Sequence, residues 1–221
     1  MAPNVLGHET GQILVAAISL SMTVTPLMHV LGNWLSPLIG HGPALNFAAI
    51  GQKTDDLDGH VIIVGFGRVG QTVAKALTLG GVDYVALDLH HGRVSRCHRE
   101  GLSVFYGNGA DIGILNAVGA GRASAAVVTT DQSASTDRAV KALRDSFPDL
   151  KIFVRARDLR HRQTLTQEGA TSVVPEALEA SLQVAGIVFR AVGTCVETID
   201  TVEQEFRRDD YLPLEETQGN D

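Results

Sequence analysis

The sequence predicts an α/β fold in which a doubly wound parallel sheet of six strands is preceded by one transmembrane helix and followed by an acidic helical tail. Three observations lead to this prediction. Short apolar runs rich in β-branched residues alternate with helical patterns, a glycine-rich turn follows the first run, and an uncharged stretch of 21 residues lies near the start. Strands that alternate with helices are typical of βαβ units, and six of them complete a Rossmann-like sheet.

Charge divides the chain, which has 221 residues and a formal net charge of −7, into pieces of different character. Residues 1–52 contain one charged side chain, Glu9, residues 53–193 are close to neutral, and residues 194–221 hold two arginines and nine acidic residues. The negative charge argues against a general nucleic-acid-binding protein. We expect a transmembrane helix over 11–35, a linker over 36–58, a folded domain over 59–193 and the acidic helical tail over 194–221.

The uncharged stretch spans residues 11–31, and its length matches the roughly 30 Å apolar core of a bilayer. A secretory signal peptide would carry basic residues before the apolar run, and this sequence has none there. A buried helix of a soluble protein is the other alternative. Since one helix cannot form a transport path, we expect this chain to be a fragment of a larger membrane protein or to have become detached from one.

The predicted strands lie in the middle piece, where the unbroken apolar run at 61–64 fits a strand covered on both faces. The strands span 61–64, 82–87, 102–106, 125–129, 150–154 and 171–174, and the clearest helices between them span 71–79 and 137–147. In the tail, Val192, Val196, Ile199, Val202 and Phe206 recur at helical spacing. This spacing predicts an amphipathic helix that packs on its own domain or crosses to a partner subunit.

A glycine-rich turn, GFGRVG at 65–70, joins the first strand to the next helix. Gly65 allows a tight turn, Gly67 lets a pyrophosphate approach the backbone, and Gly70 lets helix and strand pack closely. The phosphate would lie at the helix N-terminus, where backbone N–H groups and the helix dipole favour an anion. The Arg68 guanidinium is placed to bind that phosphate as well. This turn therefore predicts a nucleotide-binding site.

An acidic residue, Asp88, ends the second strand, about 20 residues after the glycine turn, where a carboxylate accepts hydrogen bonds from ribose hydroxyls. A carboxylate there would repel a 2′-phosphate, which favours NAD or an adenosine nucleotide over NADP. Arg93 is the counter-argument, because an arginine at this place can accept the 2′-phosphate.

Polar segments also follow the later strands, at the sheet edge where parallel α/β proteins bind ligands. Residues 107–111 (GNGAD) follow the third strand, residues 129–131 (TTD) follow the fourth, and four arginines lie within 155–162 after the fifth. The arginines indicate a docking surface for an anion or carboxylate. The alternative is the solvated start of a helix that Asp158 caps.

The common catalytic patterns are missing from the sequence. No tyrosine is followed four residues later by a lysine, as a short-chain dehydrogenase requires, and GxxxxGK[ST], HExxH and GxSxG do not occur. Cys97 and Cys195 lie far apart and suit a reducing compartment rather than a metal site. We expect a binding protein without catalytic or metal-ligating residues; the alternative is a small NAD-dependent oxidoreductase.

Three segments together resemble the RCK N-terminal domain, also called the TrkA-N domain, of Kef-type monovalent cation:proton antiporters (CPA2 family). They are GHVIIVGFGRVGQTVAKAL, VFYGNGADIGILNAVGA and VRARDLRHRQTLTQEGA. The apolar helix before them is similar to the last transmembrane helix of these antiporters. Asn108 departs from the aspartate often found there, which keeps an acceptor and removes a charge. The resemblance implies that NAD(H) or AMP binds as a regulatory ligand. The implied binding positions are Gly65, Phe66, Gly67, Arg68, Val69, Gly70, Asp88, Leu89, Asn108, Gly109, Ala110, Thr129 and Asp131.

The same resemblance implies the partners. The domain would form a homodimer and gate an attached antiporter of potassium or another monovalent cation, whose ion path is encoded upstream or missing. The transmembrane helix would lie in the inner (cytoplasmic) membrane and the domain in the cytoplasm. Glutathione-gated members bind a tripeptide near the interface of the paired domains, and Arg155 or Arg157 would contribute to such an effector site.

Overall fold

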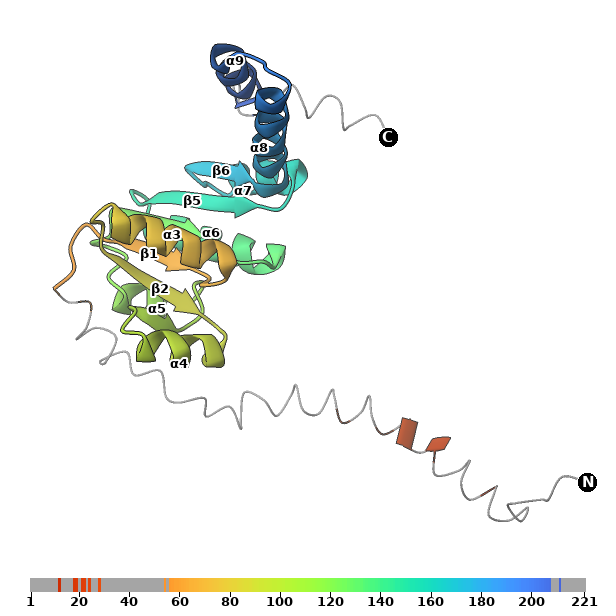
Figure 1. The fold of residues 1–221 in the computed structure, drawn as a ribbon. Helices are drawn as coiled ribbons and strands as arrows, with labels where there is room; N and C mark the ends of the chain where they lie inside the picture. The colour runs from red at the N-terminus through yellow and green to blue at the C-terminus, as the bar shows by residue number, and fades with distance from the viewer. Residues whose placement is uncertain are drawn as a thin grey trace, which may run out of the picture. The chain divides into compact units, whose positions relative to one another are not determined.

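The six predicted strands form one parallel sheet in the computed structural model (Figure 1). The structure describes residues 56–207, Thr54, Tyr211 and seven residues from Gln12 to Met28. The strand order is β3-β2-β1-β4-β5-β6, the order typical of a dinucleotide-binding sheet. The strands are β1 (Val61–Val64), β2 (Tyr84–Asp88), β3 (Val104–Tyr106), β4 (Ala125–Val128), β5 (Lys151–Ala156) and β6 (Ser172–Pro175). This architecture confirms the predicted Rossmann-like sheet.

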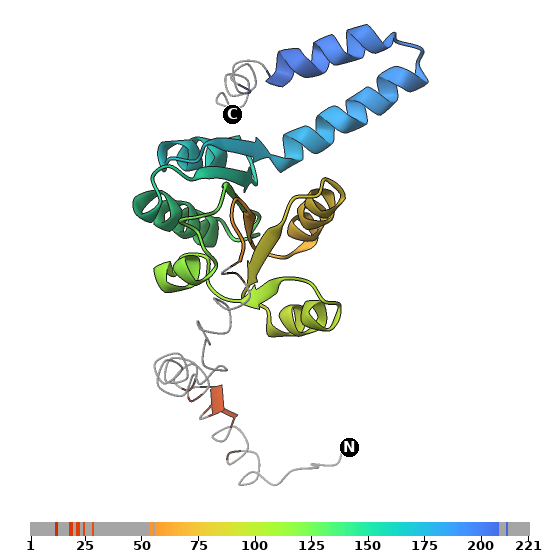
Figure 2. The same cartoon turned by 90° about the vertical axis from the view of Figure 1, so that its left-hand side faces the viewer.

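Seven helices follow the strands within the described residues from 54 onward. They are α3 (Arg68–Leu79), α4 (His91–Arg99), α5 (Ile112–Ala117), α6 (Ser133–Ser146), α7 (Leu159–Gln167), α8 (Glu176–Ala191) and α9 (Val196–Arg207). Helices α3 and α4 cover one face of the sheet, and α5, α6 and α7 cover the other (Figure 2). The predicted helices at 71–79 and 137–147 correspond to α3 and α6.

Burial on both faces explains why the strands are apolar without alternation. All four residues of β1 are buried, and Ile62 and Ile63 point to opposite faces with no exposed surface. Ile63 belongs to a cluster with Ala74 of α3 and Val94 of α4. Burial on both sides holds β1 in the centre of the sheet and fixes the position of the glycine turn that follows it.

The structure shifts several predicted boundaries by one or two residues. Strand β5 runs through Ala156, so Arg155 lies on the strand rather than after it. Strands β2 and β3 each begin two residues later than predicted. Residues at the end of the predicted linker also pack on the domain, since Thr54 is 1% exposed and donates a hydrogen bond to the Ala117 carbonyl at 2.8 Å.

The tail begins with α9, which packs against α8 (Figure 2). Arg207 at the end of α9 pairs with Glu179 near the start of α8, so the two helices run antiparallel. The predicted apolar stripe is only partly used for this packing, because Ile199 is buried whereas Val192 and Val196 are exposed. Beyond Arg207, Tyr211 is the one residue of the tail that the structure describes.

The chain divides into two compact units, Met1–Leu45 and Asn46–Asp221. The predicted transmembrane helix lies in the first unit and is almost wholly outside the described residues, so it stays a prediction. The seven described residues there are helical: Gln12, Ile18, Ser19, Ser21, Met22, Val24 and Met28. Within the part of the chain that the structure describes, no helix combines the length and the apolarity needed to cross a membrane.

Candidate nucleotide-binding site

The glycine turn after β1 leaves no space for a side chain at two of its positions. Gly65 has φ +94°, a conformation that favours glycine, and a Cβ there would lie 3.0 Å from the Thr130 nitrogen. A Cβ on Gly70 would lie 2.1 Å from the Gly65 carbonyl oxygen. The turn and the first turn of α3 are therefore pressed together, as the sequence predicts for a phosphate-binding turn.

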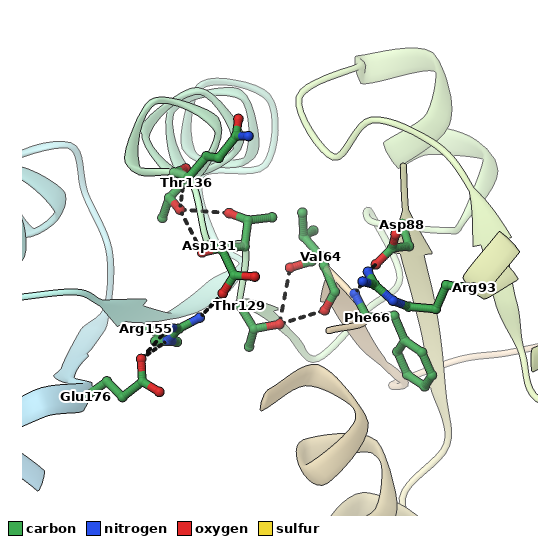
Figure 3. Close-up of polar contacts among 12 residues, drawn as sticks. Val64, Phe66, Asp88, Arg93, Thr129, Asp131, Thr136, Arg155 and Glu176 are labelled. Carbon is green, nitrogen blue, oxygen red and sulfur yellow. Dashed lines mark hydrogen bonds and ion pairs between the residues drawn. The ribbon is translucent and has the colours of Figure 1, made fainter. Parts of the chain in front are cut away.

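Hydrogen bonds from the two neighbouring strands hold this turn in place (Figure 3). The Phe66 N–H donates to Asp88 Oδ2 at the end of β2, at 2.7 Å. On the other side, the Thr129 hydroxyl after β4 donates to the Gly65 carbonyl at 2.6 Å. The turn thus lies between β2 and β4, at the point where the strand order reverses, which is where open α/β sheets bind ligands.

The N-terminus of α3 is arranged to receive an anion. Gly67 is its N-cap and provides no side-chain hydrogen bond, and the first turn begins with Arg68 rather than an acidic residue. The first N–H groups of a helix have no partner within the helix, and the helix dipole is positive at this end. A phosphate is the ligand that these features favour.

Asp88 is buried at the end of β2, and three donors surround its carboxylate. Besides the Phe66 N–H, the His90 N–H donates to Oδ1 at 2.7 Å, and Arg93 Nη1 lies 2.5 Å from Oδ2 (Figure 3). The Arg93 charge compensates the buried carboxylate. The second lone pair of Oδ1 remains suited to a ribose hydroxyl. The sequence placed Arg93 near this site but did not predict that it pairs with Asp88.

A cavity of about 350 Å³ lies at the carboxyl ends of β1, β2, β3 and β4. Eight of the predicted positions line it, namely Gly65, Gly67, Asp88, Leu89, Asn108, Gly109, Thr129 and Asp131. Gly107 and Thr130 of the predicted polar segments line it too, as does Arg93. The sequence did not predict six further lining residues, which are Val64, Leu87, His90, Gln132, Ser135 and Ala139. They lie directly beside predicted positions or on α6, where nothing in the local pattern marks them as functional.

Five predicted positions do not line this cavity. Phe66 is 1% exposed and stacks near Tyr84 with ring centroids 6.3 Å apart, so its contribution is its backbone N–H. The Ala110 N–H is bonded to Asn108 Oδ1 at 3.1 Å. Gly70 acts through close packing, and Arg68 and Val69 face a second cavity of about 310 Å³.

Asp131 lines both cavities, and Arg155 binds it. Arg155 Nη1 lies 2.7 Å from Asp131 Oδ1, and Arg155 also pairs with Glu176 at the start of α8 (Figure 3). The hydrogen bond from Arg155 holds the pKa of the Asp131 carboxyl below its usual value. Arg155 therefore connects the end of β4 with the first residue of α8.

The structure does not bring the four arginines of 155–162 together. Arg157 is exposed and borders a small hollow beside Arg155, whereas Arg162 is buried with its guanidinium 5.7 Å from the centre of the Tyr211 ring. Asp158 accepts the His161 N–H at 2.8 Å and caps α7, as the alternative interpretation predicts. Among the described residues, no group of three potential ligands could hold a metal ion.

The fold and the site define a domain of the dinucleotide-binding α/β class, with a glycine turn, an open helix N-terminus and an acid at the end of β2. The family model of the TrkA-N domain matches residues 61–176. The chain belongs to the family of TrkA-N domains.

Similar proteins include potassium efflux antiporters and a solved C-terminal domain of Kef. The chloroplastic K(+) efflux antiporter 1 of Arabidopsis thaliana is 36% identical over 92% of this chain and 17% of its own length. The glutathione-regulated potassium-efflux system protein KefC of an Enterobacter species is 32% identical over 86% of this chain and 30% of its own. The AMP-bound C-terminal domain of Kef from Shewanella denitrificans is 28% identical with a TM-score of 0.61, over 71% of this chain and 96% of that one.

The chain thus spans a third or less of the curated relatives that it matches, whereas it covers nearly all of the solved Kef C-terminal domain. The resemblance to Kef-type antiporters that the sequence predicted is confirmed by these relatives.

Proposed function

We propose that this chain is a nucleotide-sensing regulatory part of a potassium or other monovalent cation:proton antiporter, and that it binds AMP or NAD(H). The cavity between the glycine turn and Asp88 carries this proposal, because it combines a phosphate position at the α3 N-terminus with a ribose acceptor. The similar Kef C-terminal domain, which binds AMP, supports the same ligand class.

The ion pair between Asp88 and Arg93 favours an unphosphorylated ribose. Arg93 is held on the carboxylate at 2.5 Å, so its guanidinium is engaged before any 2′-phosphate arrives. Moving Arg93 to such a phosphate would leave a buried carboxylate next to two negative charges, which is costly. We therefore expect AMP and NAD(H) to bind more tightly than NADPH.

A binding domain regulates an attached transporter when its ligand favours one arrangement of the assembly over another. We propose that two copies pair through α8, where Val184, Ile187, Val188 and the C-cap residue Val192 form an exposed apolar face at helical spacing. The domain would act from the cytoplasmic side of the inner membrane on a transport path outside this chain.

The second cavity is the place that we propose for an effector. Arg68 and Arg155 border it together with Glu176, so it presents both charges to a ligand such as a glutathione-type tripeptide. Arg157, which is exposed on the other side of Arg155, would contribute only if its side chain turns toward this cavity.

Calorimetric titration of the whole chain with AMP, NADH and NADPH tests the proposed ligand class. We expect AMP and NADH to bind, NADPH to bind at least about 10-fold more weakly, and Asp88→Asn to weaken NADH by a similar factor, about 1.4 kcal/mol. Asp83→Asn, at an exposed position one residue before β2, is the matched control. Circular dichroism verifies that both variants are folded. Tighter binding of NADPH, or substantial NADH turnover with carbonyl substrates, would contradict the proposal.

A further inference from the structure

The segment through which the chain joins the domain, residues 54 and 56–60, is bonded to the amino-terminal edge of the sheet; we name it the anchor segment. The Thr54 hydroxyl donates to the Ala117 carbonyl at 2.8 Å, and His60 Nε2 donates to the Val118 carbonyl at 2.9 Å. Arg122 donates to the carbonyls of Thr54 at 3.1 Å and Leu57 at 3.4 Å. Thr54 and His60 are each 1% exposed, whereas Arg122 is exposed, so the anchor segment is held from both the buried and the solvent side.

The acceptors of the first two bonds lie at the C-terminal end of α5. The last carbonyls of a helix have no partner within the helix, and here the anchor segment supplies donors to two of them. The C-terminal end of α5 is therefore completed by residues that precede β1 in the chain.

The other end of α5 lies at the nucleotide cavity. Asn108 and Gly109 line the cavity, and the Asp111 side chain caps α5 by accepting the Gly113 N–H at 2.8 Å. The loop that joins Asn108 to α5 is held in place, since the Asp111 N–H is bonded to the Asn108 carbonyl at 2.9 Å. A Cβ on Gly109 would lie 2.2 Å from a Val64 methyl carbon, which shows how closely the loop packs on β1.

Helix α5 itself is short and is buried on one face, whereas Ile112, Gly113 and Asn116 are exposed. Its six residues span about 9 Å, and Ile114, Leu115 and the C-cap Val118 have at most 1% exposed surface. A close-packed element of this size moves as a unit rather than bending. We therefore expect a displacement at Asn108 and Gly109 to be passed through the buried face of α5 to Ala117 and Val118.

We propose that α5 couples the nucleotide site to the anchor segment, so that a bound nucleotide stabilises the attachment of this segment to the domain. The inference rests on the proposed nucleotide-binding function. Coupling between two sites is reciprocal. The factor by which a nucleotide stabilises the bonds of the anchor segment must therefore equal the factor by which loss of those bonds weakens nucleotide binding.

Amide hydrogen exchange of the whole chain, with and without saturating AMP, measures this coupling. The reporters are the N–H groups of Leu57, Gly59 and Ser124, which donate to the carbonyls of Thr54, Arg122 and His60. We expect AMP to slow their exchange at least about 5-fold. The double variant Thr54→Val with Arg122→Gln removes three of the bonds described above. In this double variant we expect the three reporter N–H groups to exchange fast both with and without AMP. We also expect its AMP affinity to fall by the factor by which AMP slows exchange of the reporters in the unmodified chain.

The matched control is Thr201→Val on α9, where the hydroxyl donates to the Glu197 carbonyl at 2.7 Å, far along the chain from the anchor. This variant should keep the full effect of AMP on the three reporters. Calorimetry with AMP on the same samples separates the two proposals. Binding of AMP without slower exchange at the reporters overturns the coupling alone, whereas absence of AMP and NADH binding overturns the proposed function and the coupling with it.

Discussion

Gly70 is the residue at which the glycine turn has the least room. A methyl group there would lie 2.1 Å from the Gly65 carbonyl oxygen and 3.0 Å from the Thr129 hydroxyl, and both belong to the hydrogen bond that holds the turn. We expect Gly70→Ala to lower the free energy of unfolding by about 2 kcal/mol, within the usual range for overpacking, and to weaken nucleotide binding. Urea denaturation measures the first effect and calorimetry the second.

Gly121→Ala provides the comparison for this prediction. A Cβ on Gly121 would meet no atom within 4 Å, so we expect its unfolding midpoint to stay close to that of the unmodified chain. Equal stability of the two variants would mean that the turn can open without cost, and the close contact at Gly70 would then not position the phosphate site.

The residues of the site differ in how well the sequence predicts them. Gly65 and Asp88 were predicted because the chemistry of each depends on a short pattern directly after a strand. The Arg155 pairs with Asp131 and Glu176 join positions 24 and 21 residues apart, and no local pattern carries that information. The same holds for Arg122, which lies 68 residues from Thr54 and bonds the anchor segment through the Thr54 carbonyl.

Among the elements, α8 and α9 are held together by a polar contact among Glu179, Arg207 and Tyr211. Glu179 on α8 accepts from Arg207 Nη2 at 2.9 Å and from the Tyr211 hydroxyl at 2.5 Å. The Arg207 hydrogen bonds hold the pKa of Glu179 below its usual value, whereas burial and the neighbouring carboxylate raise the pKa of Tyr211 to about 12. The contact is thus formed by an ionised glutamate and a neutral tyrosine.

These two pKa shifts predict the pH range in which the contact is stable. A lowered Glu179 pKa stabilises the fold above the unfolded value of 4.5, and this stability is lost as the pH falls through the folded value. A raised Tyr211 pKa stabilises it below pH 10, and that stability is lost as the pH rises toward about 12. Tyrosinate absorbance, compared between the chain and its Tyr211→Phe variant, should show one tyrosine ionising near pH 12.

Tyr211→Phe should also lower the stability of the α8–α9 pair near neutral pH. The loss of one hydrogen bond to a partly solvated carboxylate costs about 1 kcal/mol. Tyr106→Phe is a control, because Tyr106 is on β3, away from this contact. If the difference spectrum places the Tyr211 ionisation near pH 10, its hydroxyl is not bonded to Glu179 in solution.

Elements with strong local patterns were predicted well, and those defined by packing were not. The six strands are confirmed because short buried runs and the helices between them repeat along the chain. Helix α9 occurs where the tail predicts a helix, but its packing on α8 depends on Arg207 and Glu179, which lie 28 residues apart. The helix predicted over 11–35 lies almost wholly outside the described residues and remains a prediction.

Over the whole domain, polar contacts lead from the nucleotide cavity in two directions. Toward the amino-terminal edge, α5 carries the path from Asn108 to the anchor segment. Toward the carboxyl side, Asp131 lines the cavity and Arg155 binds both Asp131 and Glu176, the first residue of α8. If a nucleotide binds in this cavity as we propose, it is placed to influence both the anchor segment and the helix proposed to pair two copies.

The apolar face of α8 gives the last prediction, which concerns assembly. Val184, Ile187, Val188 and Val192 are each more than half exposed, and a second copy of α8 would cover them in a two-fold pair. Val188→Asp places a charge at the centre of this face, and burying it unpaired should raise the dimer dissociation constant at least about 100-fold. Leu79→Asp, on an exposed apolar residue of α3, should leave the dimer intact. Analytical ultracentrifugation of the whole chain distinguishes the outcomes, and a Val188→Asp protein that remains dimeric would show that the copies pair through another surface.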